Sequence, residues 1–193
     1  MKRILLCIFT FSILSSCNKI KSDKIESENV IIKKNEAQKE EKKQDSILNY
    51  WEIILDTITE QKEFKNIGIN KLELKTFSLN DSLIVRNLGK VENQIYIDYS
   101  HTMVTDIKLF TESNFDTKRI DKTKFKKILD PEFYADCNLF STKIENIVGN
   151  IIFLTSDLNI PDTDNQWRVW YSIKIKNNKL ENIEITKTDY VGM

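Results

Sequence analysis

The sequence has little glycine, proline, cysteine or histidine: its 193 residues include four glycines, two prolines, three cysteines and one histidine. Three recurrent catalytic patterns are missing. There is no Gly-Lys-Ser/Thr phosphate loop, no Gly-x-Ser-x-Gly elbow and no His-Glu-x-x-His zinc motif. His101 has no metal-ligand partner at helical or hairpin spacing, which favours a polar loop residue. We therefore predict no catalytic residue, no metal, no other cofactor and no enzymatic activity.

An excess of charge of one sign is also missing, because 29 Lys and Arg residues balance 29 Asp and Glu residues. Loss of Lys2 and Arg3 with a cleaved leader would make the remaining chain slightly acidic. Nucleic-acid-binding domains carry strong basic patches, and anionic lipids attract polybasic segments. The charge balance therefore argues against a nucleic-acid partner and against a polybasic surface that binds anionic lipids.

No apolar run reaches the roughly 20 residues that a membrane-spanning helix needs. The run Ile4–Leu14 follows Met1-Lys2-Arg3, which is typical of a secretory signal peptide rather than a retained helix. Leu14-Ser15-Ser16-Cys17 resembles the bacterial lipobox. We predict that residues 1–16 are removed and that Cys17 carries a diacylglyceryl group and a fatty acid such as palmitate. Membrane lipid is then the first predicted partner.

Residues 17–45 are rich in Lys, Glu, Asn, Gln and Ser and contain no aromatic residue. Such a composition buries too little apolar surface to offset the entropy of ordering, so it predicts a flexible tether. The remaining residues, 46–193, are enough for a single domain with one core.

The cysteines do not predict a disulfide framework, because Cys7 leaves with the leader and Cys17 carries lipid. Cys137 is then alone. A reactive thiol, paired with His101 or not, and an intermolecular disulfide are both alternatives, but a small buried apolar residue is favoured.

Residues 46–60 fit two patterns. Ile47, Trp51 and Ile54 lie at helical spacing, whereas Trp51, Ile53 and Leu55 alternate as in a strand. We favour a helix near 46–60, with Asp45 or Ser46 as its N-cap.

Downstream, apolar residues mostly recur with a period of two, which predicts strands. Residues 71–88 read as a hairpin around Asn80-Asp81-Ser82. Further strands are expected at 95–99, 105–109, 139–148, 151–160 and 167–175, with Gly149-Asn150 as the hairpin turn that joins 139–148 to 151–160. Helical spacing returns only near 121–136. Asn177-Asn178 suits a type I′ turn, and a bulge near Glu181-Asn182 would bring Ile183 onto the apolar face.

This pattern predicts a mainly β fold of about eight strands, either an antiparallel β-sandwich or an open barrel-like sheet. One short helical insertion near 121–136 would cover a face or an end of it. The connections look too short for parallel crossovers.

Two clusters suggest binding. Trp167 and Tyr171 share the inward parity of their strand, so Trp170 points outward, either exposed or covered by the helix, as a weak ligand-binding candidate. Asp157, Asp162, Asp164 and Asn165 could be read as a calcium site, but they lack the Gly and the distal Glu of a calcium loop. A proline-initiated turn is the better interpretation.

Four short motifs carry a resemblance over residues 70–185. They are Leu79-Asn80-Asp81-Ser82, Lys122-x-x-Phe125, Asp130-Pro131-Glu132-Phe133 and Pro161-Asp162-Thr163-Asp164. Together they resemble a family of small Bacteroidota lipoproteins with a domain of unknown function. The resemblance implies an envelope location and assigns no functional residue. Asn18–Asp23 departs from the acidic run of surface-exported lipoproteins, so we expect an outer-membrane protein facing the periplasm, with surface exposure as the alternative.

The function that these observations favour is a membrane-anchored, non-catalytic module that binds an envelope protein or glycan. A hydrolase is the first alternative, and it would need two carboxylates about 5 to 9.5 Å apart in one pocket. An inhibitor or immunity-type protein is the second.

Overall fold

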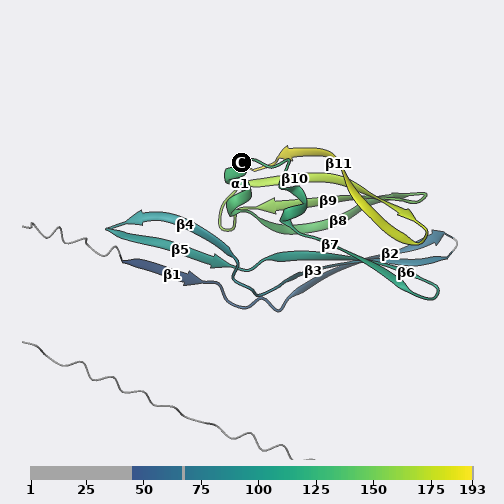
Figure 1. Ribbon diagram of the computed structural model, residues 1–193, viewed down its shortest axis with the longest axis horizontal. Coiled ribbons are helices and arrows are strands. Elements are labelled where there is room, and N and C mark those ends of the chain that lie inside the picture. The colour runs from purple at the N-terminus through teal and green to yellow at the C-terminus, as the bar shows by residue number, and fades with distance from the viewer. Residues whose placement is uncertain (1–44, 67, 193) are drawn as a thin grey trace, which may run out of the picture. The chain divides into compact units, whose positions relative to one another are not determined.

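The computed structural model describes residues 45–66 and 68–192, which form eleven strands, one 3-10 helix and one short α-helix (Figure 1). In chain order these are β1 (Ser46–Tyr50), β2 (Thr57–Asn66), β3 (Ile69–Ser78), β4 (Ile84–Val91), β5 (Gln94–Ser100), β6 (Met103–Thr111), β7 (Phe115–Ile120), η1 (Lys122–Phe125), α1 (Pro131–Asp136), β8 (Asn138–Val148), β9 (Ile151–Asn159), β10 (Gln166–Lys176) and β11 (Lys179–Tyr190).

The strands form three sheets. Sheet A has the order β1-β5-β4, sheet B the order β2-β3-β6-β7, and sheet C the order β11-β10-β9-β8. Sheets B and C pack face to face, with β8 against β3 and β6 and with β11 against β7. The predicted mainly β fold is thus confirmed, and it has the sandwich form.

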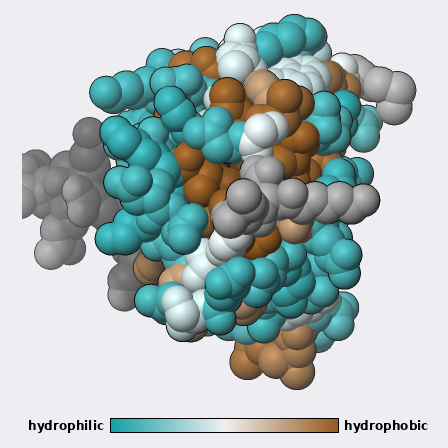
Figure 2. Space-filling view, turned by 90° about the vertical axis from the view of Figure 1, so that its right-hand side faces the viewer, coloured by the Kyte–Doolittle hydropathy of each residue, from teal (hydrophilic) through white to brown (hydrophobic). Residues whose placement is uncertain are grey.

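The core lies between sheets B and C. Strands β3 and β6 bury alternate side chains, as the period of two requires. The largest fully buried side chains come from both sheets and the helical insertion: Tyr171, Phe125, Leu72, Leu74, Ile107, Leu109, Ile120, Leu139, Ile152, Leu154, Leu158 and Ile173. Figure 2, seen from the right-hand side of Figure 1, shows apolar residues gathered between hydrophilic flanks.

A row of hydroxyl groups crosses this apolar core. Thr76 bonds Thr105 at 2.8 Å, Thr105 donates to Thr142 at 3.1 Å, Thr142 bonds Ser156 at 2.9 Å, and Ser156 bonds Tyr171 at 3.0 Å. All five residues are buried. Since each hydroxyl has a partner in the row, the row joins the two sheets without leaving a buried polar group unsatisfied.

The helical insertion predicted near 121–136 is confirmed as η1 and α1. Asp121 and Asp130 are their N-caps, each accepting a bond from a backbone N–H of its first turn. The Phe125 ring lies 5.5 Å from that of Tyr171, and Phe133 lies 6.1 Å from Trp167. The insertion therefore packs against residues of sheet C.

The C-terminal hairpins are also confirmed. β8–β9 and β10–β11 pair as expected, and Asn177 and Asn178 both have positive φ, at 52° and 60°. The register shifts between Ile173 and Ile175, so that Ile173 faces Ile183. This is the bulge expected near Glu181-Asn182.

The helix favoured near 46–60 is wrong. Residues 46–50 form β1, which pairs with β5, and β2 begins at Thr57. Between them, Trp51–Asp56 is an irregular segment, neither helix nor strand, which we call the strap. Backbone bonds to β5 and side-chain bonds to the strap, described below, outweigh the helical spacing of Ile47, Trp51 and Ile54.

Two expectations about pairing are wrong as well. Residues 71–88 are not a hairpin, because β3 pairs with β2 and β6 while β4 pairs with β5. The Asn80-Asp81-Ser82 cluster bonds to the strap and to residues 101–102, so it is a junction between sheets. The connections were also expected to be too short for parallel pairing, but β1 and β5 are parallel. The connection between them is long enough because it includes three other strands.

The predicted signal peptide, the lipid-bearing Cys17 and the tether up to residue 44 lie outside the described residues. Within the described part of the chain, no helix has the length and apolar character to cross a bilayer.

Candidate functional site

Side chains from distant parts of the chain fix the strap. Asn80 bonds both backbone groups of Ile54: its Oδ1 accepts from the N–H at 2.9 Å, and its Nδ2 donates to the carbonyl at 3.0 Å. The N–H of Trp51 donates to the carbonyl of Tyr99 at 3.0 Å. The strap therefore has a defined path without being helix or strand.

His101, expected to be a polar loop residue, is 4% exposed and holds the strap at Glu52. Its Nδ1 accepts from the backbone N–H of Ser82 at 3.1 Å, which leaves Nε2 to carry the proton. Nε2–H then donates to the carbonyl of Glu52 at 3.1 Å. Both ring nitrogens are used in holding the fold together.

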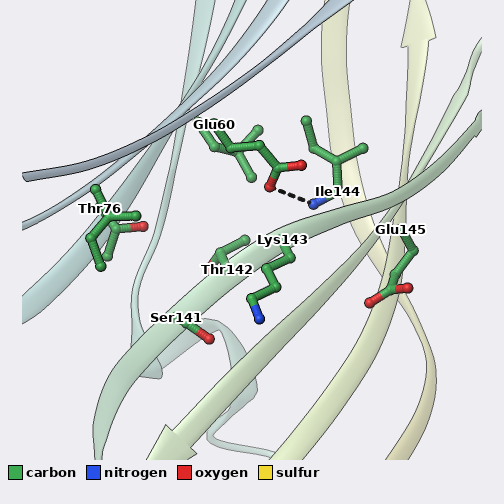
Figure 3. A pocket seen from close by; sticks show the side chains of 9 residues that line it. Glu60, Thr76, Ser141, Thr142, Lys143, Ile144 and Glu145 are labelled. Atoms are coloured by element: carbon green, nitrogen blue, oxygen red, sulfur yellow. Dashed lines mark hydrogen bonds between the residues drawn. The ribbon is translucent and has the colours of Figure 1, made fainter.

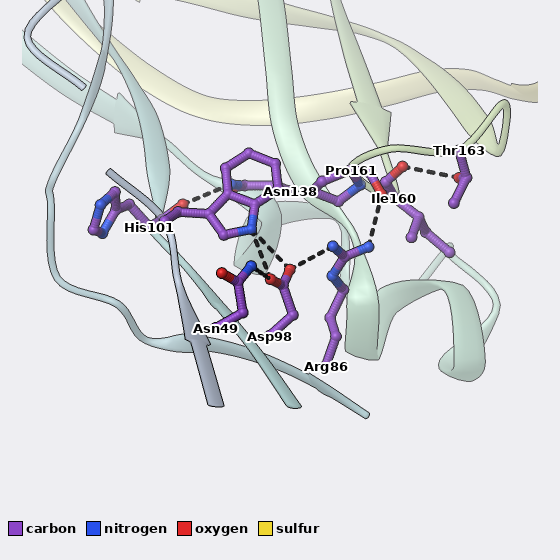
Figure 4. Close-up of polar contacts among 9 residues, drawn as sticks. Asn49, Arg86, Asp98, His101, Asn138, Ile160, Pro161 and Thr163 are labelled. Atoms are coloured by element: carbon purple, nitrogen blue, oxygen red, sulfur yellow. Dashed lines mark hydrogen bonds and ion pairs between the residues drawn. The ribbon is translucent and has the colours of Figure 1, made fainter. Parts of the chain in front are cut away.

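A buried ion pair lies beside the strap (Figure 4). The Arg86 guanidinium donates to Asp98 at 2.6 Å and to the carbonyl of Pro161 at 2.7 Å. Asp98 also accepts from the indole of Trp51 at 2.8 Å and from the amide of Asn49 at 2.6 Å. Arg86 thereby ties sheet A to the loop between β9 and β10.

Burial alone would raise the pKa of the Asp98 carboxyl. Hydrogen bonds from Arg86, Asn49 and Trp51, together with the Arg86 charge, outweigh burial, so the pKa of Asp98 lies below its ordinary value. Asp98 is thus a carboxylate that fixes the Trp51 ring.

A recess of about 360 Å³ lies where the strap meets the sandwich. Its lining is mostly apolar, and we call it the strap recess: Trp51, Ile54, Ile58, Ser100, His101, Met103, Asn138, Leu139, Phe140, Asn159, Pro161 and Asp162. The Ser100 side chain is buried, and its hydroxyl has no hydrogen-bond partner among the described residues. The hydroxyl is enclosed by protein, so the recess offers a ligand a mostly apolar wall with a few other polar side chains, which is the composition of a ligand site.

A second hollow, of about 440 Å³, adjoins the recess at Ile58, which lines both, and we call it the edge groove. It lies between β2 and β8, the edge strands of sheets B and C. Glu60 accepts from the N–H of Ile144 at 3.1 Å (Figure 3), and Lys62 donates to the carbonyl of Ile144 at 3.1 Å.

The edge groove has two carboxylates in its lining, Glu60 and Glu145. Glu60 is held by Ile144, and Glu145 accepts from the Thr155 hydroxyl at 2.6 Å. Figure 3 places the two side chains on opposite sides of β8.

No model of a known protein family matches the chain, and no curated protein matches it either. The resemblance to Bacteroidota lipoproteins stays a prediction.

Trp170 lies apart from the recess and the groove. It is half-buried on the outer face of sheet C, with the Lys187 ammonium 4.6 Å and the Arg168 guanidinium 5.9 Å from its ring. Trp167 and Tyr171 belong to the core or pack against it, as predicted.

Cys137 is fully buried and unbridged, which confirms the favoured interpretation. Burial raises the pKa of its thiol to about 11, although the neighbouring Lys122 acts in the opposite direction.

The aspartates near 157–165 do not converge. Asp157 forms a two-point ion pair with Arg168, at 2.6 and 3.0 Å. Among residues 45–66 and 68–192, no group of three or more His, Cys, Asp or Glu side chains is placed to hold a metal.

The sequence did not reveal Ser100, Arg86 or Asp98. Arg86 and Asp98 lie directly opposite each other in the β4–β5 register, so correct pairing of these strands would have exposed the ion pair. The unsatisfied hydroxyl of Ser100 has no sequence signal.

Proposed function

We propose that this chain is a lipid-anchored, non-catalytic binding module of the bacterial cell envelope. Cys17 holds it to the membrane, and the strap recess is its ligand site. The observation that carries the proposal is the recess itself: a mostly apolar hollow of about 360 Å³ with a few polar side chains in its wall.

The surroundings of the recess support a preformed site. Asn80, His101 and Asp98 bond the strap at Ile54, Glu52 and Trp51, so this wall of the recess is held at three residues before any ligand arrives. A site that is already ordered loses less entropy on binding, which raises affinity.

Methyl NMR of methionine tests the ligand site, because Met103 lines the recess. Cyclohexanol, an apolar ring with one hydroxyl, is the probe. We expect its titration to shift the Met103 methyl signal saturably while the other methionine signals stay fixed.

Ile58→Trp, at a rim position that is 65% exposed, should fill the recess and abolish the shift. Trp170→Ala, on the outer face of sheet C, is the matched control and should preserve it. A Met103 signal that never moves, or that moves equally in Ile58→Trp, would contradict the proposed site.

The anchor has its own test. Cells fed an alkyne analogue of palmitate should label the wild-type chain and not Cys17→Ser, as read by click chemistry on gels. Equal labelling of the wild-type and Cys17→Ser chains would show that Cys17 is not the lipid attachment site.

A further inference from the structure

Strand β8 is an edge of sheet C, and its lateral backbone groups face the edge groove. Both backbone groups of Ile144 bond to β2 side chains, so they point away from β9. Backbone direction alternates along a strand, and no register shift separates Thr142 from Ile144. The N–H and C=O of Thr142 therefore also point away from β9.

Side chains cap the neighbouring N–H groups of this edge. Asn138 accepts from Leu139 at 3.0 Å, Glu60 from Ile144 at 3.1 Å, and Asn146 from Ile147 at 2.8 Å. Thr142 has no such cap among the described residues. Caps of this kind block strand addition, so the edge is blocked on both sides of Thr142, whose own N–H and C=O are left unpaired by the described part of the chain in the wall of the edge groove.

The open position lies next to the recess. Asn138–Phe140 line the strap recess and Ser141–Glu145 line the edge groove, with Ile58 in both linings. One stretch of β8 therefore runs along two adjacent hollows. From Leu139 to Thr142 is three residues, or about 10 Å of strand.

We propose that the ligand of this module is an extended peptide that adds as a strand to β8 at Thr142 and places an apolar side chain in the strap recess. The inference rests on the proposed function and gives its ligand a chemical class. The free backbone groups select an extended chain, and the recess selects the apolar residue. Glu60 and Lys62 already bond the backbone of Ile144, so the added strand cannot pair with β8 at that residue.

The probe is an immobilised library of N-acetylated, C-amidated decapeptides, each with one Leu, Ile, Phe or Met among randomised polar residues. Full-length chain is applied, and the best binders are measured by fluorescence polarisation. We expect binders to require the apolar residue and to lose at least tenfold in affinity with Ile58→Trp.

N-methylation of each peptide residue in turn tests the strand. Because one peptide N–H donates to the Thr142 carbonyl, methylation should cost tenfold or more at that one residue and less than twofold at the residues on either side. A peptide whose affinity shows no such single sensitive position, or a library with no binder, would overturn the inference.

Two substitutions test the protein side. Thr142→Val and Thr142→Pro both remove the hydroxyl, but only proline removes the N–H, and proline is tolerated on strand edges. We expect the proline variant to bind at least tenfold more weakly than the valine variant, and equal affinities would contradict strand addition. If the proline variant fails to fold, the N-methyl series still decides.

Cyclohexanol separates the two proposals. If it shifts Met103 while no peptide binds, the recess stands and strand addition falls. If neither binds, both fall.

Discussion

At the residue scale, the Arg86–Asp98 pair is the most constrained charge interaction in the described part of the chain. Its side chains are 5% and 3% exposed, whereas those of the Arg119–Asp106 pair are 48% and 24% exposed. Loss of one partner from a buried pair leaves the other charge uncompensated, which costs far more than loss of an exposed pair.

Asp98→Asn should therefore lower the free energy of unfolding by about 3 to 5 kcal/mol, because Arg86 stays buried without its anion. Asp106→Asn is the matched control and should cost less than about 1 kcal/mol. Urea unfolding followed by tryptophan fluorescence measures both. Similar losses in the two variants would mean that the Asp98 pair is effectively solvated.

Acid should remove this contribution. The pKa of Asp98 is lower in the folded chain than its ordinary value of 3.8, so its stabilisation is full above that value and is lost as pH falls through the folded pKa. The stability difference between wild type and Asp98→Asn should stay constant from pH 7 to about pH 5 and shrink below about pH 4. A difference that is unchanged at pH 2 would contradict this.

Cys137 should be inert in the folded protein, since its thiol is buried and has a pKa of about 11. In a chain with Cys7 and Cys17 replaced by serine, a disulfide reagent at pH 8 should label no thiol until denaturant is added, when it should label one. Rapid labelling of the native chain would show that the Cys137 thiol becomes exposed without unfolding.

At the element scale, the hydroxyl row and the strap define this sandwich. The hydroxyl row has no periodic sequence signature, because Thr and Ser occupy positions that alternation assigns to the apolar face. Each hydroxyl in the row bonds another hydroxyl, either on the neighbouring strand of its own sheet or on the opposite sheet.

Thr105→Val keeps the shape and removes the hydroxyl that bonds both Thr76 and Thr142. We expect a loss of about 1 to 3 kcal/mol, because a buried hydroxyl is left without a partner. Thr117→Val, at an exposed position of β7, should change stability by less than about 0.5 kcal/mol. Thermal or urea unfolding compares the two. A neutral Thr105→Val would show that the row carries no net stability.

Sequence reasoning succeeded where local pattern decides. The C-terminal hairpins, the bulge beside Ile183 and the capped insertion follow from alternation, turn residues and N-caps. It failed where distant contacts decide: the strap is held by Asn80 and His101, which are remote in sequence, and the parallel β1–β5 pair brings together residues 49 positions apart.

At the scale of the whole molecule, sheet A and the strap distinguish this chain from a plain two-sheet sandwich. Sheet A brings Asp98, Ser100 and the following His101 to the end of the sandwich, and β8 adds its free edge to the same region. The proposed anchor at Cys17 would keep the domain that carries this combined surface in the cell envelope, among envelope polypeptides.

Site-specific photocrosslinking in intact cells tests the central claim most directly. A photoreactive residue replaces Phe140, which is 58% exposed at the recess, or Lys174, an exposed control on the outer face of sheet C. We predict a discrete crosslinked species from position 140 that disappears with Ile58→Trp, and none of that kind from position 174. Absence of a crosslink at position 140, or one that persists when the recess is filled, would contradict the claim that the recess is the binding site.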